Sequence, residues 1–164
     1  MRKLLTAAAL IGVGVLIGGY GAWGQRSAGL NTQKVVNLYR IEKLEKIWHK
    51  AASKKKLNLM MSIWAKRAVF TYNGKTFKGK HAIRSLFAKA GPFQPQNHWI
   101  SDTPEYKIRA TVNGSKGTLY FECHYVDVDS KVLKVWVANQ ADLRRINGKW
   151  LIVDSSATTP TLKP

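Results

Sequence analysis

Apolar residues recur at helical spacing along residues 34–51 and form one continuous stripe. The stripe contains Val35, Leu38, Tyr39, Ile41, Leu44, Ile47, Trp48 and Ala51. Two shorter segments with helical character follow at residues 57–64 and 80–90, and Gly91 and Pro92 end the second of them. The first half of the chain therefore predicts three helices, with a short β-leaning run at residues 68–72 between the last two.

The second half of the chain has the composition of β-strands. Its β-rich segments are residues 98–101, 106–112, 118–126, 132–143 and 149–155. Residues typical of hairpin turns separate the last four segments, at residues 113–114, 127–130 and 147–148. Because such turns join antiparallel neighbours, the sequence predicts an α+β domain whose helices pack on one face of a curved antiparallel sheet.

The beginning of the chain differs in composition from the rest. Residues 4–24 carry no charge and follow Arg2 and Lys3, which is the pattern of a signal peptide or a membrane anchor. Residues 25–33 contain Gly, Ser and Asn and are interpreted as a linker, and residues 34–160 as the folded domain. We therefore expect a membrane-anchored protein, or a secreted or periplasmic one.

Positive charge is concentrated close to this leader. Residues 31–100 contain 15 Lys and Arg residues against two Glu residues, within a chain whose formal net charge is +18. A basic surface beside a hydrophobic leader favours an anionic membrane surface as the partner, and a solvated surface is the alternative. No nucleic-acid-binding motif accompanies the charge, so nucleic acid is not expected as a partner.

The sequence offers little for a cofactor or a metal ion. Cys123 is the only cysteine, the four histidines are scattered, and the folded region has no glycine motif for phosphates or dinucleotides. We therefore expect no cofactor and no metal site. The six Trp, six Tyr and five Phe residues fit an apolar core or cavity.

Four segments of the chain, in this order, resemble the SnoaL-like domain of the nuclear transport factor two and ketosteroid isomerase-like superfamily. Residues 57–70 are similar to its second helix and first strand, and residues 79–87 fit its pattern G-x-x-A-I-x-x-x-F. Residues 97–101 are similar to its histidine-bearing strand, and residues 142–152 to its closing hairpin. The resemblance covers residues 34–160 and implies a cone-shaped fold, in which a strongly bent sheet wraps over three helices around an apolar cavity.

The resemblance also implies that Trp48, Tyr72, His98 and Asp142 line this cavity. Steroid isomerisation in the superfamily uses a carboxylate base where this chain has Tyr72 and a tyrosine where it has Trp48, so only the carboxyl group at Asp142 is retained and that reaction is excluded. SnoaL-like cyclases pair a histidine with an aspartate, which makes His98 and Asp142 the candidate catalytic acid–base pair. The alternative is that His98 is a structural histidine and Asp142 the partner of a nearby arginine.

Alternation along residues 118–126 predicts which of these residues face the helices. The inward set is Leu119, Phe121, Cys123 and Tyr125. Glu122 and His124 then lie on the outer face of the sheet, where this fold commonly forms a homodimer. His49 and His81 belong to basic helical segments and are expected to be exposed.

These observations favour a SnoaL-like domain that binds a small apolar ligand or serves as an assembly module. The alternative is an enzyme of the isomerase, cyclase or dehydratase type that uses His98 and Asp142 on a small hydrophobic substrate. The two hypotheses differ in one structural feature, because an enzyme of this kind needs His98 and Asp142 within hydrogen-bond reach beside a cavity.

Overall fold

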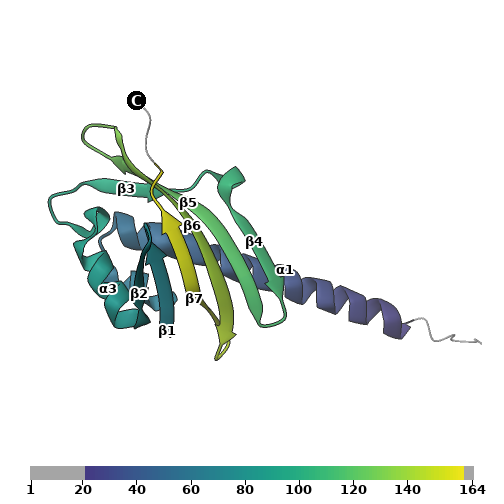
Figure 1. The fold of residues 1–164 in the computed structure, drawn as a ribbon. Coiled ribbons are helices and arrows are strands. Elements are labelled where there is room, and N and C mark those ends of the chain that lie inside the picture. The colour runs from purple at the N-terminus through teal and green to yellow at the C-terminus, as the bar shows by residue number, and fades with distance from the viewer. Residues whose placement is uncertain (1–20, 161–164) are drawn as a thin grey trace, which may run out of the picture.

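A bent sheet that curves around one long helix forms the body of the molecule (Figure 1). The computed structural model describes residues 21–160, with side chains from residue 32. The helices are α1 (Gly21–Ser53), α2 (Leu57–Ser62) and α3 (Gly79–Lys89), with two 3₁₀ turns, η1 (Gly91–Phe93) and η2 (Glu105–Lys107). The strands are β1 (Trp64–Tyr72), β2 (Lys75–Lys78), β3 (Trp99–Asp102), β4 (Arg109–Asn113), β5 (Lys116–Asp127), β6 (Leu133–Ile146) and β7 (Lys149–Thr158).

The three helices expected from periodicity are present, and each of the five predicted C-terminal strands has a counterpart. Two boundaries differ from the prediction, because Trp64 begins β1 and residues 105–107 form η2 ahead of β4. Residues 25–33, interpreted as a linker, have helical backbone within α1. Glycine in a helix interior costs only about 1 kcal/mol relative to alanine, which is too little for Gly29 to end so long a helix.

The leader expected at residues 1–24 lies mostly outside the described residues, which begin at residue 21. The signal peptide or anchor, and with it the location of the protein, therefore stays a prediction. Within the described part of the chain, no helix is both long enough and apolar enough to cross a membrane.

The seven strands form a mixed sheet in the order β2-β1-β7-β6-β5-β3, with β4 also paired to β5. Strands β1 and β7 run parallel, with Phe70 opposite Ser155, whereas the other neighbours are antiparallel. The prediction of a wholly antiparallel sheet was wrong for this pair. Hairpin turns specify only strands that follow one another in the chain, whereas β1 and β7 come from opposite ends of the domain.

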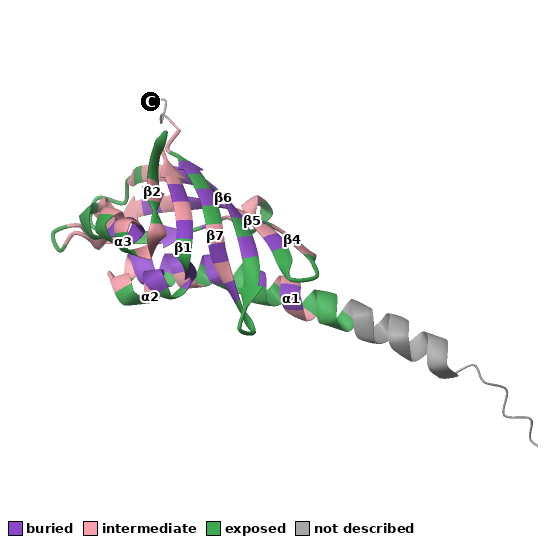
Figure 2. Cartoon of the chain, turned by 60° about the horizontal axis from the view of Figure 1, so that its bottom comes forward, coloured by how far each residue is buried: buried purple, intermediate pink, exposed green. Residues whose placement is uncertain are grey.

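The core lies between α1 and the concave face of the sheet. Ile41, Leu44 and Trp48 are buried there, so this part of the predicted apolar stripe of α1 packs on the sheet, whereas Val35 and Tyr39 of the same stripe are exposed. Figure 2 shows α1 changing from exposed to largely buried where it passes under the strands. Gly117 on β5 permits this approach, because a Cβ atom there would lie 2.7 Å from Ile41 Cδ1. The predicted inward set of β5 is also confirmed, since Leu119, Phe121, Cys123 and Tyr125 are all buried.

Candidate functional site

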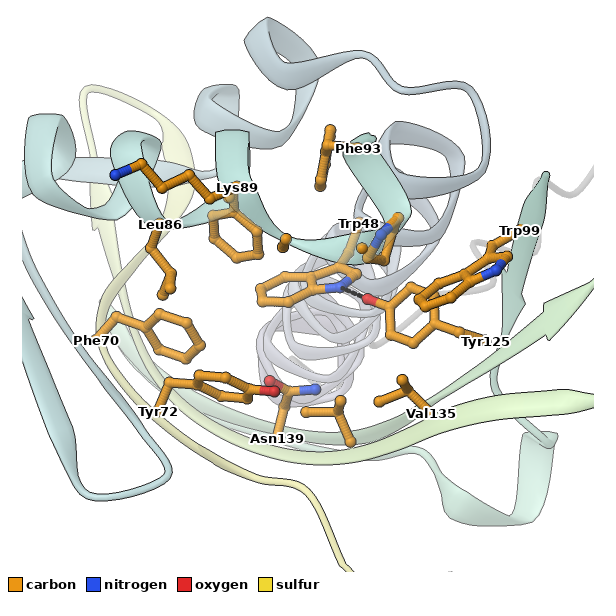
Figure 3. Close-up of a pocket in the computed structure, with 15 residues that line it drawn as sticks. Trp48, Phe70, Tyr72, Leu86, Lys89, Phe93, Trp99, Tyr125, Val135 and Asn139 are labelled. Carbon is orange, nitrogen blue, oxygen red and sulfur yellow. Dashed lines mark hydrogen bonds between the residues drawn. The ribbon is translucent and has the colours of Figure 1, made fainter. Parts of the chain in front are cut away.

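A cavity of about 330 Å³ lies between the helices and the concave face of the sheet (Figure 3). Side chains from α1, β1, β5 and β6 form one part of its wall, and the end of α3 with η1 and β3 forms the rest. Seven of the lining residues are aromatic: Trp48, Phe70, Tyr72, Phe87, Phe93, Trp99 and Tyr125. A cavity of this size and composition is suited to a small apolar molecule.

Trp48 organises the aromatic wall. Its indole lies 5.2 Å from the Phe87 ring in edge-on geometry, and the Phe70 and Phe87 rings stack at 5.8 Å. Phe70 and Tyr72 point to the same face of β1 because they are two residues apart on a strand. The structure therefore places Trp48 and Tyr72 in the lining of the cavity, and their contact with a ligand stays a prediction.

A close contact between Gly91 and Trp99 positions the turn at one side of the cavity. A Cβ atom at residue 91 would lie 2.5 Å from a ring carbon of Trp99, so a larger residue there would push the indole or the turn aside. Pro92 and Phe93 complete the turn and also line the cavity. The loop between α3 and β3 thus shapes the cavity through its backbone as well as its side chains.

The polar groups in the lining are few. Trp48 Nε1 donates to the Tyr125 hydroxyl at 3.2 Å, and Tyr72 shares a hydrogen bond of 2.8 Å with Thr159. Burial raises the pKa of Tyr125 well above its ordinary value, so this hydroxyl stays protonated. Lys89 is exposed, and Figure 3 shows its amino group pointing away from the cavity.

Asn139 is a polar residue of the cavity that sequence reasoning missed. It is fully buried on β6, and its Nδ2 donates to Cys123 Sγ at 3.3 Å. Burial also raises the pKa of the Cys123 thiol, which makes this cysteine an unreactive neutral partner. The signal in the sequence was the alternation Val135, Val137, Asn139, in which one polar residue takes an inward position of an apolar strand.

His98 lies outside the cavity. Its side chain is exposed, and Nδ1 pairs with Asp129 Oδ2 at 2.7 Å on the surface. The neighbouring Trp99 points into the cavity, so strand alternation turns His98 and Ile100 the other way. The prediction that His98 lines the cavity is corrected on this ground.

Asp142 also lies outside the cavity, on the outer face of the sheet. It is exposed on β6, whereas its neighbours Ala141 and Leu143 are buried. On β5, the partner of Asp142 is Thr118 and the partner of Trp99 is Asp127, nine positions further along. That separation is about 30 Å along an extended strand.

The structure therefore does not bring His98 and Asp142 together. The predicted acid–base pair is corrected, because each residue belongs to the outward half of its own strand pattern and the two lie towards opposite ends of β5. Both outward positions could have been found from the apolar neighbours of the two residues.

A second polar cluster, buried between α1 and β3, was also missed. His49, expected to be exposed, is buried and contacts Ser101 Oγ at 2.5 Å through Nδ1. Its Nε2 contacts Thr103 Oγ1 at 2.5 Å and Glu45 Oε1 at 3.0 Å. Glu45 and His49 are one helical turn apart, so they share the face of α1 that packs on the sheet. The cluster does not line the cavity and ties α1 to β3. His81 is exposed, as expected.

Glu122 occupies the outer face of the sheet, as predicted, but it is buried there. Burial by itself would raise the pKa of Glu122. Hydrogen bonds from Tyr120, Lys107 and His124 outweigh that effect, so the pKa lies below its ordinary value. Glu122 is thus a paired anion within this face. A homodimer formed through this face stays a prediction.

The chemistry that the cavity can perform follows from its lining. Among the described residues that line it there is no Asp, Glu or His, so these common proton-transfer groups are missing from the wall. What remains is a surface of aromatic rings with the buried amide of Asn139. A surface of this kind is suited to an apolar molecule.

Comparison with known proteins agrees with this architecture. Residues 39–155 match the SnoaL-like domain family. No curated protein matches the chain in sequence. Among solved structures, an NTF2-like protein with a cystatin-like fold from Novosphingobium aromaticivorans superposes with a TM-score of 0.69 at 17% identity, covering 88% of this chain and 94% of that one.

Two further solved structures have the same fold. An NTF2-like protein from Pseudomonas putida gives a TM-score of 0.68 at 15% identity, covering 79% of this chain and 98% of that one. A hexachlorocyclohexane dehydrochlorinase from Novosphingobium barchaimii gives 0.66 at 18% identity, covering 82% of this chain and 93% of the enzyme. At these identities the likeness shows the fold alone.

Proposed function

Because this chain belongs to the SnoaL-like domain family, and its cavity is walled by aromatic side chains, we propose that it binds a small apolar molecule without converting it. The observation that carries the proposal is the cavity of about 330 Å³ with seven aromatic residues in its lining. Such a site gains binding free energy from burial of apolar surface and from ring contacts.

The alternative, an enzyme of the isomerase, cyclase or dehydratase type, receives its main support from the fold, because a dehydrochlorinase shares it. Catalysis of those reactions requires a proton acceptor or donor beside the ligand. The residues proposed for that role, His98 and Asp142, lie outside the cavity. The cavity itself therefore favours binding over conversion.

We expect a substitution that fills the cavity to weaken ligand binding. Val137 lines the cavity on β6, and Val137→Phe would place a ring in the space that a ligand needs. Titration with 2-naphthol, followed by its fluorescence, should give a Kd raised at least about tenfold, equivalent to about 1.4 kcal/mol. The control is Val153→Phe, which makes the same change on β7, where Val153 borders the polar depression around Asp142 on the outer face.

Unchanged 2-naphthol binding by the Val137→Phe variant would show that the probe sits elsewhere on the protein. A native protein that binds neither 2-naphthol nor naphthalene would overturn the proposed function. A circular-dichroism melting curve for each variant separates loss of the cavity from loss of the fold.

We also propose that one side of α1 lies on an anionic lipid surface. The solvent-facing stripe of α1, called here the α1 stripe, consists of Val35, Tyr39, Lys43, Lys46 and Lys50, spaced by three or four residues. Val35 and Tyr39 are 58% and 56% exposed, and Lys43 Nζ lies 5.1 Å from the Tyr39 ring centre. Exposed apolar residues beside lysines suit the boundary between headgroups and acyl chains.

The charge of the stripe supports the same partner. Lys107 is the one lysine or arginine that makes a salt bridge to a carboxylate among the side chains that the structure describes. The lysines of the α1 stripe are thus free to attract anionic headgroups, each contributing about 1 kcal/mol near the surface.

Replacing Lys43, Lys46 and Lys50 by Gln should weaken binding to phosphatidylserine-containing vesicles by about 100-fold at low salt, since three such contacts are removed. The measurement is cosedimentation with vesicles. A matched control replaces the exposed Lys66, Lys75 and Lys78, which lie on β1 and β2, and so removes the same charge elsewhere. An equal loss in both variants would mean that net charge, not the α1 stripe, attracts the vesicle.

A further inference from the structure

In the region that the structure describes, only one of the two polar atoms of the Asn139 side chain makes a hydrogen bond. Its side chain is fully buried, and its Nδ2 is used by Cys123 Sγ. Its Oδ1 has no hydrogen-bond partner among the residues that the structure describes. In Figure 3 the amide lies at the sheet side of the cavity, with its oxygen on the side of Tyr72.

The register of the sheet explains why Asn139 lines the cavity next to Tyr72. Tyr72 on β1 is opposite Ala157 on β7, and Ala157 is opposite Asn139 on β6, so the three residues form one row across the sheet. The side chain of Ala157, between them in the row, is small and fills little space. Tyr72 and Asn139, on either side of Ala157, both line the cavity.

The two tyrosine hydroxyls of the wall already make hydrogen bonds. The Tyr125 hydroxyl accepts from Trp48 Nε1, and the Tyr72 hydroxyl is engaged with Thr159. Val135 and Val137, which precede Asn139 on the inward face of β6, offer no polar group. Asn139 Oδ1 therefore stands out in the described lining as a buried acceptor with its capacity unused.

A buried acceptor without a partner destabilises the fold, because it has lost its contact with water and gained nothing in return. A leucine or valine at this inward position would avoid that penalty. A donor on a bound molecule would remove it as well, and would do so only when the molecule is in the cavity.

We propose that Asn139 Oδ1 is the group that determines ligand specificity, and that the ligand is a small aromatic or alicyclic molecule with an O–H or N–H donor at one end. This inference rests on the proposed function, since it names the chemistry of the molecule that the cavity binds. The apolar body lies among Trp48, Phe70 and Phe87, and the donor reaches Asn139.

The test compares two probes of similar shape, 2-naphthol and 2-methoxynaphthalene, by isothermal titration calorimetry. Both fill the cavity with the same rings, but methylation removes the donor. We expect the native protein to bind 2-naphthol about tenfold more tightly than its methyl ether, since the ether leaves the buried oxygen unpaired. This comparison needs no variant and therefore does not depend on whether any substitution folds.

The second arm repeats the comparison with Asn139→Leu, which keeps the branched outline of the side chain and removes the amide. The preference for 2-naphthol should disappear, while 2-methoxynaphthalene should bind at least as well as it does to the native protein. The melting temperature of the ligand-free variant should equal or exceed that of the native protein, because no unpaired amide is buried. The control is Gln140→Leu, an exposed position next along β6 on the outer face, which should keep the preference.

The outcomes separate this inference from the proposed function. If both probes bind the native protein equally, the cavity binds ligands but Asn139 does not select donors, and the inference is overturned. If the preference survives in Asn139→Leu, another group recognises the donor, which also overturns it. If neither probe binds the native protein, the proposed function fails and the inference fails with it.

Discussion

Truncation of Trp48 to alanine is expected to lower the free energy of unfolding by about 3–5 kcal/mol, the range typical of a large aromatic side chain removed from a core. Trp48 is 2% exposed and contacts the rings of Trp64, Phe70, Phe87 and Phe121. Its removal would enlarge the cavity and leave the Tyr125 hydroxyl without the indole donor. Guanidinium unfolding followed by circular dichroism measures the loss.

The matched control for this prediction is Tyr39→Ala on the same helix. Tyr39 is 56% exposed, so its removal should change the free energy of unfolding by no more than about 0.5 kcal/mol. A loss below about 1 kcal/mol for Trp48→Ala would contradict its central place in the core, since even smaller buried side chains cost more than that. Trp48→Phe, which keeps one aromatic ring but loses the second ring and the N–H donor, should lie between the two.

The second large effect on the free energy of unfolding is expected from substitutions at the buried contact between Glu45 and His49. His49→Leu should lower the free energy of unfolding by about 3 kcal/mol or more, because it leaves a carboxylate in the core without its partner. Glu45 is 4% exposed, and its Oε1 lies 3.0 Å from His49 Nε2. Thermal unfolding at neutral pH measures the loss.

The double variant Glu45→Leu with His49→Leu should recover at least half of that loss, since two apolar side chains then replace the pair and no buried charge remains. Thr103, one hydroxyl partner of His49, also donates to the carbonyl of Glu122, and we expect this hydrogen bond to persist in both variants. A double variant as unstable as His49→Leu would show that the hydrogen bonds of His49, and not the unpaired Glu45, hold α1 to β3.

The residues predicted to line the cavity show which side-chain directions can be found from local sequence pattern. Trp48 was placed by its position in the apolar stripe of α1 together with the family resemblance, and the structure sets it in the cavity wall. His98 and Asp142 were placed by resemblance alone, and the structure sets both on the surface. Trp99, Ala141 and Leu143 are apolar and occupy inward positions, so alternation with them already placed His98 and Asp142 outward. Periodicity therefore predicted the direction of these side chains better than their resemblance to a family motif did.

Buried polar residues mark the limit of the sequence signal. His49 was expected to be exposed on a basic helical segment, yet it is buried against β3 together with Glu45. Hydropathy assigns charged residues to the surface because burial of a single charge is costly. A partner from another element reverses that preference, and Ser101 and Thr103 are such partners, separated from His49 by more than 50 residues.

The sequence by itself determined the elements that depend on near neighbours: the three helices, the strands of the C-terminal half with their hairpin turns, and the inward set of β5. Periodicity and turn residues act over a few residues, so they can be found without the fold. Only the tertiary structure decided the parallel pairing of β1 with β7, the burial of His49, and the row that brings Tyr72 and Asn139 to one cavity. These features join segments distant in the chain, and their free energy comes from burying both partners at once, which no local stretch of sequence contains.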